Sequence, residues 1–120
     1  MKVLVVDDDQ LTLKTIGHTL KEEGFDVSMA KDVSVALNVI KNEKIDLVIS
    51  DIMMPDVSGL GLISLLKNFY LDNIPVILIS SLNKKNIIAS SSELGAAYFL
   101  TKPIDMNELL VCIKNIFNNK

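Results

Sequence analysis

Short apolar runs alternate with segments of helical periodicity five times along this chain. The apolar runs cover 2–7, 25–29, 47–50, 76–79 and 98–100. The helical segments cover 10–23, 33–41, a stretch beginning near 59, 84–94 and the residues after 105. Repeated strand–helix units of this kind predict an α/β fold with a parallel sheet covered by helices on both faces.

Several helical segments carry their own start and stop signals. Asp32 and Asp105 are good N-caps for the segments that follow them, and Gly24 is a suitable residue to end 10–23. The serine-rich segment 84–94 has the weakest helical propensity. Four residues of 10–23 share one apolar face at helical spacing: Leu13, Ile16, Gly17 and Leu20.

The strands differ in how their apolar residues are distributed, and the difference predicts their order. In 25–29, Phe25, Val27 and Met29 alternate with polar residues, which indicates one solvated face and an edge position. The runs 47–50 and 76–79 are apolar nearly throughout, as in central strands. We therefore expect a single five-stranded parallel sheet of order 2-1-3-4-5.

Polar groups stand where four of these strands end. Asp7-Asp8 follow the first strand, Asp51 the third, Ser80 the fourth, and Thr101-Lys102-Pro103 the fifth. The carboxyl ends of parallel strands lie at one edge of the sheet, where open α/β sheets bind ligands. We therefore expect these residues to form one site, with the loops after strands 1 and 3 as neighbours.

The chemistry of this site follows from its charge. Two unit charges about 4 Å apart repel by roughly 4 kcal/mol at an effective dielectric of about 20. Asp7, Asp8 and Asp51 carry three negative charges and Lys102 returns one positive charge. A divalent cation would cancel the remainder, and carboxylate oxygens favour Mg²⁺. A carboxylate can also act as a nucleophile and form an acyl phosphate, for which Asp51 is our candidate.

Composition limits the class of protein. The 120 residues suit one domain spanning 1–120, and the net charge of −3 disfavours direct binding of nucleic acid. Cys112 is the only cysteine, which fits a reducing compartment. We see no signal peptide and no apolar run long enough to span a bilayer. The chain is therefore expected to be cytoplasmic.

The motifs together resemble the receiver domain of two-component response regulators, over essentially the whole chain. They are Val5-Val6-Asp7-Asp8, the segment 51–56 (Asp-Ile-Met-Met-Pro-Asp), Gly59, Ser80 and Lys102-Pro103. The resemblance implies a flavodoxin-like (CheY-like) three-layer sandwich.

The resemblance also implies roles for individual residues. Asp51 would accept phosphate from a sensor histidine kinase or phosphotransfer protein, while Lys102 and Ser80 contact the phosphoryl group. Asp8, Asp51 and the backbone carbonyl of Met53 would ligate Mg²⁺, with Asp7 acting through water. Ser80 and Phe99 match the switch pair of the family, and the Lys102–Pro103 bond is expected to be cis.

The implied function is signalling. The chain would catalyse only its own phosphorylation and dephosphorylation. Phosphorylation would change the surface formed by 84–118, which would act on an output protein, a fused output domain or a second copy of the chain.

Two other functions fit parts of the sequence. The chain could be a receiver-like binding scaffold that works without phosphorylation. Alternatively, the Asp7-x-Asp9 pair is similar to the nucleophile pair of haloacid-dehalogenase-type phosphatases, although Asp51 would then have no role.

Overall fold

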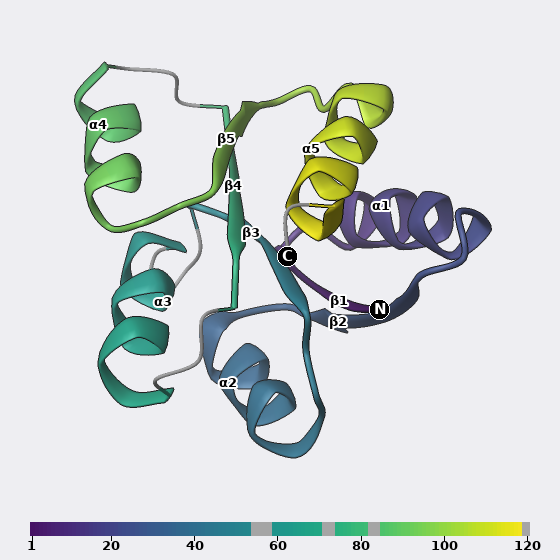
Figure 1. Ribbon diagram of the computed structural model, residues 1–120, viewed down its shortest axis with the longest axis horizontal. Coiled ribbons are helices and arrows are strands. Elements are labelled where there is room, and N and C mark those ends of the chain that lie inside the picture. Colours follow the sequence, from purple (N-terminus) through teal and green to yellow (C-terminus); the bar gives the residue numbers. More distant parts are fainter. Residues whose placement is uncertain (54–58, 71–73, 82–84, 119–120) are drawn as a thin grey trace.

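The computed structural model describes residues 1–53, 59–70, 74–81 and 85–118. Five parallel strands form one sheet in the order β2-β1-β3-β4-β5 (Figure 1), which confirms the predicted order. The strands are β1 (Lys2–Val6), β2 (Asp26–Ala30), β3 (Leu47–Asp51), β4 (Val76–Ser80) and β5 (Tyr98–Thr101). The helices are α1 (Gln10–Glu22), α2 (Val33–Asn42), α3 (Gly59–Leu65) with its π-helical continuation η1 (Leu66–Tyr70), α4 (Lys85–Glu93) and α5 (Met106–Asn118).

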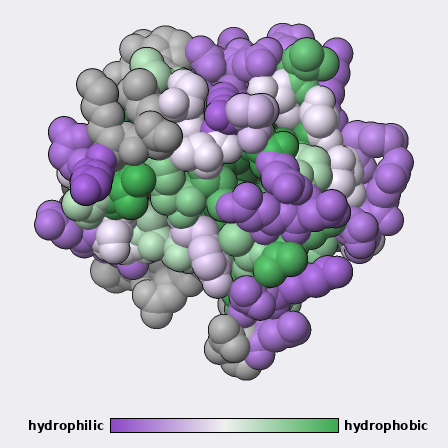
Figure 2. All heavy atoms as spheres, turned by 90° about the horizontal axis from the view of Figure 1, so that it is seen from above, coloured by the Kyte–Doolittle hydropathy of each residue, from purple (hydrophilic) through white to green (hydrophobic). Residues whose placement is uncertain are grey.

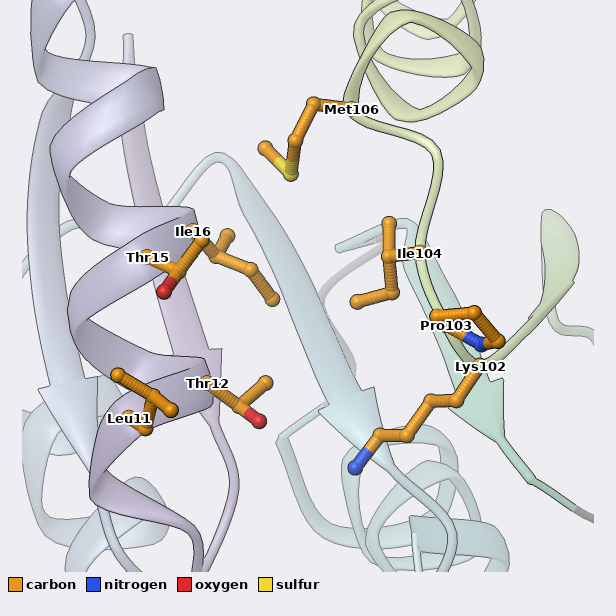
Figure 3. Close-up of a pocket in the computed structure, with 8 residues that line it drawn as sticks. All are labelled: Leu11, Thr12, Thr15, Ile16, Lys102, Pro103, Ile104 and Met106. Atoms are coloured by element: carbon orange, nitrogen blue, oxygen red, sulfur yellow. The ribbon is translucent and has the colours of Figure 1, made fainter.

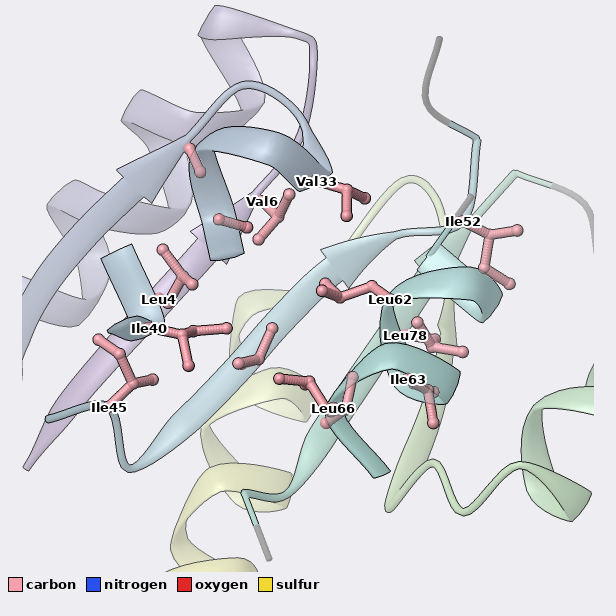
Figure 4. Packing of buried hydrophobic residues seen from close by; sticks show 14 residues of the cluster. Leu4, Val6, Val33, Ile40, Ile45, Ile52, Leu62, Ile63, Leu66 and Leu78 are labelled. Atoms are coloured by element: carbon pink, nitrogen blue, oxygen red, sulfur yellow. The ribbon is translucent and has the colours of Figure 1, made fainter. Parts of the chain in front are cut away.

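The helices cover both faces of the sheet. Helices α1 and α5 lie on one face, and α2, α3 and α4 lie on the other (Figure 1). Successive residues of a strand point to opposite faces, so β1 sends Val3 and Val5 into one core and Leu4 and Val6 into the other. Figure 4 shows the core under α2 and α3. The sheet is packed between these two cores, which hold the carboxyl ends of its strands in place.

The burial of β2, β3 and β4 agrees with their predicted positions at the edge or in the centre of the sheet. All five residues of β3 and all five of β4 are buried, as expected for central strands, whereas β2 is an edge strand with one buried residue. Two details of the prediction are wrong. Strand β2 begins at Asp26, not Phe25, and Met29, expected on the buried face, is 41% exposed. Phe25 instead packs beside the core of the α1 and α5 face, so its apolar character reflected packing outside the ladder.

The helix signals in the sequence are confirmed. The buried residues of α1 are Leu13, Ile16, Gly17 and Leu20, and Gly24 follows the helix with a φ of 91°. The Asp32 carboxylate accepts a hydrogen bond from the Val35 N–H at 2.8 Å. The Asp32 cap uses a backbone donor that the first helical turn leaves unpaired, and the Gly24 N–H donates to the Lys21 carbonyl at the end of α1.

The fourth helix is anchored weakly. Only Ser91 of α4 is buried, and its hydroxyl donates to the Ile88 carbonyl of the same helix at 2.7 Å. A helix with so little buried apolar surface gains little from packing. It is therefore the described helix most easily displaced.

Large apolar side chains seldom reach the surface of the described residues. Those that do are Met1, Leu11, Met29, Met53, Ile88 and Val111. On the face in Figure 2, hydrophobic residues gather near the middle and hydrophilic residues border them. Among the described residues, no helix combines the length and the apolar character needed to cross a membrane.

Gly59, the first residue of α3, is held against the end of β3. Its N–H donates to the Ile52 carbonyl at 3.0 Å. A Cβ atom added to Gly59 would lie 2.4 Å from the backbone oxygen of Asp51, closer than any carbon–oxygen contact allows. A residue without a side chain is therefore required where α3 approaches Asp51.

We predict opposite effects for alanine at two helical glycines. Gly59→Ala should lower the free energy of unfolding by about 2 kcal/mol or more, because backbone must shift to relieve the overlap. In Gly17→Ala the new Cβ would lie 3.4 Å from the Met29 sulfur, an ordinary contact, so helix propensity should raise stability by roughly 0.5–1 kcal/mol. Denaturant unfolding measures both values, and a Gly59→Ala protein as stable as the wild type would contradict the close approach.

Candidate functional site

Three carboxylates from two strand ends meet at one edge of the sheet. Strands β1 and β3 are paired, with Val6 opposite Ser50, so the residues that follow them are neighbours. One ligand oxygen from each of Asp7, Asp8 and Asp51 lies within 4.8 Å of the other two. Asp7 and Asp51 are buried and Asp8 is exposed. The arrangement concentrates negative charge at a site open to solvent on one side.

Lys102 lies between the two buried carboxylates. Its Nζ atom is 3.1 Å from Asp7 Oδ2 and 3.2 Å from Asp51 Oδ2, and the Lys102–Asp7 pair joins residues 95 positions apart. The lysine follows β5, and its backbone N–H donates to the Ser80 carbonyl at 2.9 Å. The peptide bond to Pro103 is cis. One cation thereby contacts carboxylates that end two different strands.

Asp7 has a hydrogen-bond partner on each carboxylate oxygen. Oδ1 accepts from the Asp9 N–H at 2.9 Å, and Oδ2 accepts from Lys102. Burial nevertheless raises the pKa of Asp7 above its ordinary value, and the charge of Asp51 adds to the rise. The hydrogen bonds from Asp9 and Lys102 act to lower this pKa but do not outweigh burial. A charged Asp7 is therefore costly to the fold unless more positive charge is supplied.

The pKa of Lys102 responds to the same groups. Burial acts to lower this pKa, but the hydrogen bond to Asp7 and the charges of Asp51 and Asp7 together outweigh burial and raise it. The ammonium is therefore held in its charged form by the carboxylates around it.

Asp51 is presented by a turn at the end of β3. Its Oδ1 accepts from the Met53 N–H at 3.2 Å, and its Oδ2 contacts Lys102. The side chain is 7% exposed, while the neighbouring Met53 is 53% exposed. Asp51 is thus nearly buried and is oriented by two donors.

Ser80 and Phe99 lie on the last two strands of the sheet. Ser80 is fully buried at the end of β4, opposite Thr101 in the register. Phe99 is half-buried on β5 and packs beside the core of the α2 and α3 face. Of the motif at 51–56, Met54, Pro55 and Asp56 lie outside the described residues.

Asp9 has a structural role instead of joining the carboxylate cluster. It caps α1 by accepting from the Leu11 N–H at 3.1 Å, and its other oxygen accepts from the Thr12 hydroxyl at 2.7 Å. Both oxygens are engaged within the first helical turn. This geometry disfavours the phosphatase hypothesis, in which the Asp7-x-Asp9 pair would provide the chemistry.

An apolar groove beside Lys102 was not anticipated from the sequence. It lies between α1 and the residues after β5 and includes Leu11, Ile16 and Ile104. The one available signal was Leu11, an apolar residue outside the buried stripe of α1.

Comparison with known proteins places this fold and site in a family. Residues 3–114 match the model of the response regulator receiver domain. The chain belongs to this family, and it is a receiver domain of the type found in two-component response regulators.

Relatives and solved structures agree with this assignment. The chain is 38% identical to "Probable transcriptional regulator ycf29" of Pyropia yezoensis over 96% of this chain and 52% of that protein. It is 30% identical to "Transcriptional regulatory protein CrdR" of Helicobacter pylori over 98% of this chain and 55% of that protein. The receiver domain of the Francisella response regulator 1452 superposes with a TM-score of 0.92 at 31% identity, covering 98% of this chain and 97% of that one. The chain spans about half the length of these two curated relatives.

We predict that removing one carboxylate stabilises the metal-free fold. Asp8→Ala should raise the melting temperature by about 2–5 °C in chelator at neutral pH, because it reduces repulsion with Asp7 and Asp51. The pKa of Asp7 in the folded state is raised from its ordinary value of 3.8. Above this raised pKa, the charge of Asp7 lowers the free energy of unfolding by its full amount. The cost disappears as the pH falls toward 3.8, and the gain from Asp8→Ala should shrink in the same range.

Asp9→Ala is the matched control for this experiment. It removes a carboxylate one position away but also removes the cap of α1, so it should lower the free energy of unfolding by about 1 kcal/mol. A clear loss of metal-free stability in Asp8→Ala would mean that the cluster does not repel as argued.

Proposed function

We propose that Asp51 accepts a phosphoryl group from a phosphohistidine of a sensor histidine kinase or phosphotransfer protein. The observation that carries the proposal is the contact of Lys102 Nζ with both Asp7 and Asp51. It holds a cation beside a carboxylate nucleophile, where negative charge on a transferred phosphoryl group would develop. Phosphoryl transfer depends mainly on such positioning and charge neutralisation.

The proposed reaction forms one bond and breaks one. An oxygen of Asp51 attacks phosphorus while the phosphorus–nitrogen bond of the donor breaks, and the donor imidazole keeps the electron pair and takes up a proton. The Met53 N–H and Lys102 orient the Asp51 carboxylate. Lys102 and the Ser80 hydroxyl are our candidates to contact phosphoryl oxygens.

We propose Asp7, Asp8, Asp51 and the backbone carbonyl of Met53 as the residues that hold Mg²⁺. All are hard oxygen donors, which suit this cation. The excess negative charge of these carboxylates, whose oxygens lie within 4.8 Å of one another, supports the fit because it favours an added cation. When bound, Mg²⁺ supplies positive charge to the carboxylates and to phosphoryl oxygens.

The signal would leave the site through Ser80 and Phe99. Phe99 borders a cavity of about 270 Å³ whose walls include Ser91, Ala96 and Ala97, and α4 beside it is weakly anchored. A small shift in the balance between two conformations can therefore reshape the 84–118 surface. We propose that an output protein, an output domain or a second copy of this chain binds there, and that the protein works in the cytoplasm.

The proposal predicts which aspartate carries the phosphoryl group. Incubated with acetyl phosphate and Mg²⁺, the chain should gain the mass of one phosphoryl group in intact-protein mass spectrometry. Asp51→Asn and Asp51→Ala should abolish the gain, because the nucleophile is lost. Asp9→Asn should retain it, because asparagine can still cap α1.

Two results would contradict the proposal. A phosphorylation-independent scaffold would show no mass increase in the wild-type chain. A phosphatase of the haloacid-dehalogenase type would require Asp9 and tolerate Asp51→Asn.

A further inference from the structure

A groove of about 240 Å³ opens beside the acidic site. Figure 3 shows α1 on one side of it and the segment from Pro103 to Met106 on the other, with the Lys102 side chain crossing one end. Lys102 is therefore a wall of the groove and also a contact of Asp51. The residues that line the groove are Leu11, Thr12, Thr15, Ile16, Lys102, Pro103, Ile104 and Met106.

The surface of the groove is mainly apolar, and two of its polar groups are already engaged. The Thr12 hydroxyl donates to Asp9 Oδ2 at 2.7 Å, and the Lys102 ammonium is held by Asp7 and Asp51. Leu11, at the rim, is 72% exposed. A ligand that covered Leu11 would remove apolar surface from water, which is favourable.

We infer that this groove binds the hydrocarbon part of small acyl phosphates, so that the chain accepts phosphate faster from donors with longer acyl chains. The inference rests on the proposed phosphorylation of Asp51. Lys102 attracts the phosphoryl end, while Leu11 and Ile104 offer apolar contact to the other end. The volume of about 240 Å³ lies just below the range of small-molecule sites, which begins at about 300 Å³, and suits a chain of only a few carbons.

The reaction balances without a further reactant. An Asp51 oxygen forms a bond to phosphorus while the bond from phosphorus to the acyl oxygen breaks, and the carboxylate leaves with the electron pair. Burying one methylene fully favours binding by about fourfold. Butyryl phosphate has two more methylenes than acetyl phosphate, and the groove is open to solvent, so we expect an advantage of roughly three- to tenfold.

The test compares three donors on the intact chain with Mg²⁺. The second-order rate constant of phosphorylation is measured by mass spectrometry for butyryl phosphate, acetyl phosphate and phosphoramidate. Phosphoramidate, whose leaving group has no carbon, is the reference rate for each protein. The wild type should prefer butyryl over acetyl phosphate, and Leu11→Ser should bring the ratio close to one.

Val111→Ser is the matched control, because Val111 is 57% exposed on α5 and does not line the groove. It should keep the wild-type ratio. A wild-type ratio near one, or an unchanged ratio in Leu11→Ser, would overturn the inference and favour a protein side chain as the occupant. If no donor phosphorylates Asp51, the proposed function itself fails and the inference falls with it.

Discussion

The ammonium of Lys102 between Asp7 and Asp51 is the interaction on which the site depends. It joins the ends of β1, β3 and β5 through two contacts of 3.1 and 3.2 Å. The parallel sheet places all three strand ends at one edge, and two helical layers keep the sheet rigid beneath them. One positive charge against three carboxylates leaves an excess of negative charge. Burial is the main cause of the raised pKa of Asp7, and the charge of Asp51 adds to it.

This imbalance connects the stability of the fold to its proposed chemistry. Carboxylates that repel one another in the free protein are those that an added cation or a phosphoryl donor would use. The adjoining structure is correspondingly uneven. Helix α3 packs closely against the backbone of Asp51 at Gly59. Helix α4 packs loosely, because only one of its residues is buried. We therefore expect a change at Asp51 to displace α4 more easily than α3.

Much of this was predictable from sequence, because periodicity and strand-end chemistry are local signals. The buried face of α1, the caps at Asp32 and Asp105 and the sheet order are confirmed. The sequence predicted that Lys102 would lie in the carboxylate site, but not that it would contact both Asp7 and Asp51. The close approach of Gly59 and the groove beside Leu11 were also not predictable, because they depend on contacts between distant residues. The exposure of Met29 was missed because alternation alone does not say how much of an edge strand a helix covers.

The central claim is that an unbalanced carboxylate cluster binds Mg²⁺, and a titration of thermal stability tests it most directly. The melting temperature of the wild-type chain should rise saturably with Mg²⁺, because a ligand that binds only the folded state stabilises it. In Asp8→Asn the rise should require a much higher Mg²⁺ concentration. A wild-type melting temperature that does not respond to Mg²⁺ beyond the effect of ionic strength would contradict the account.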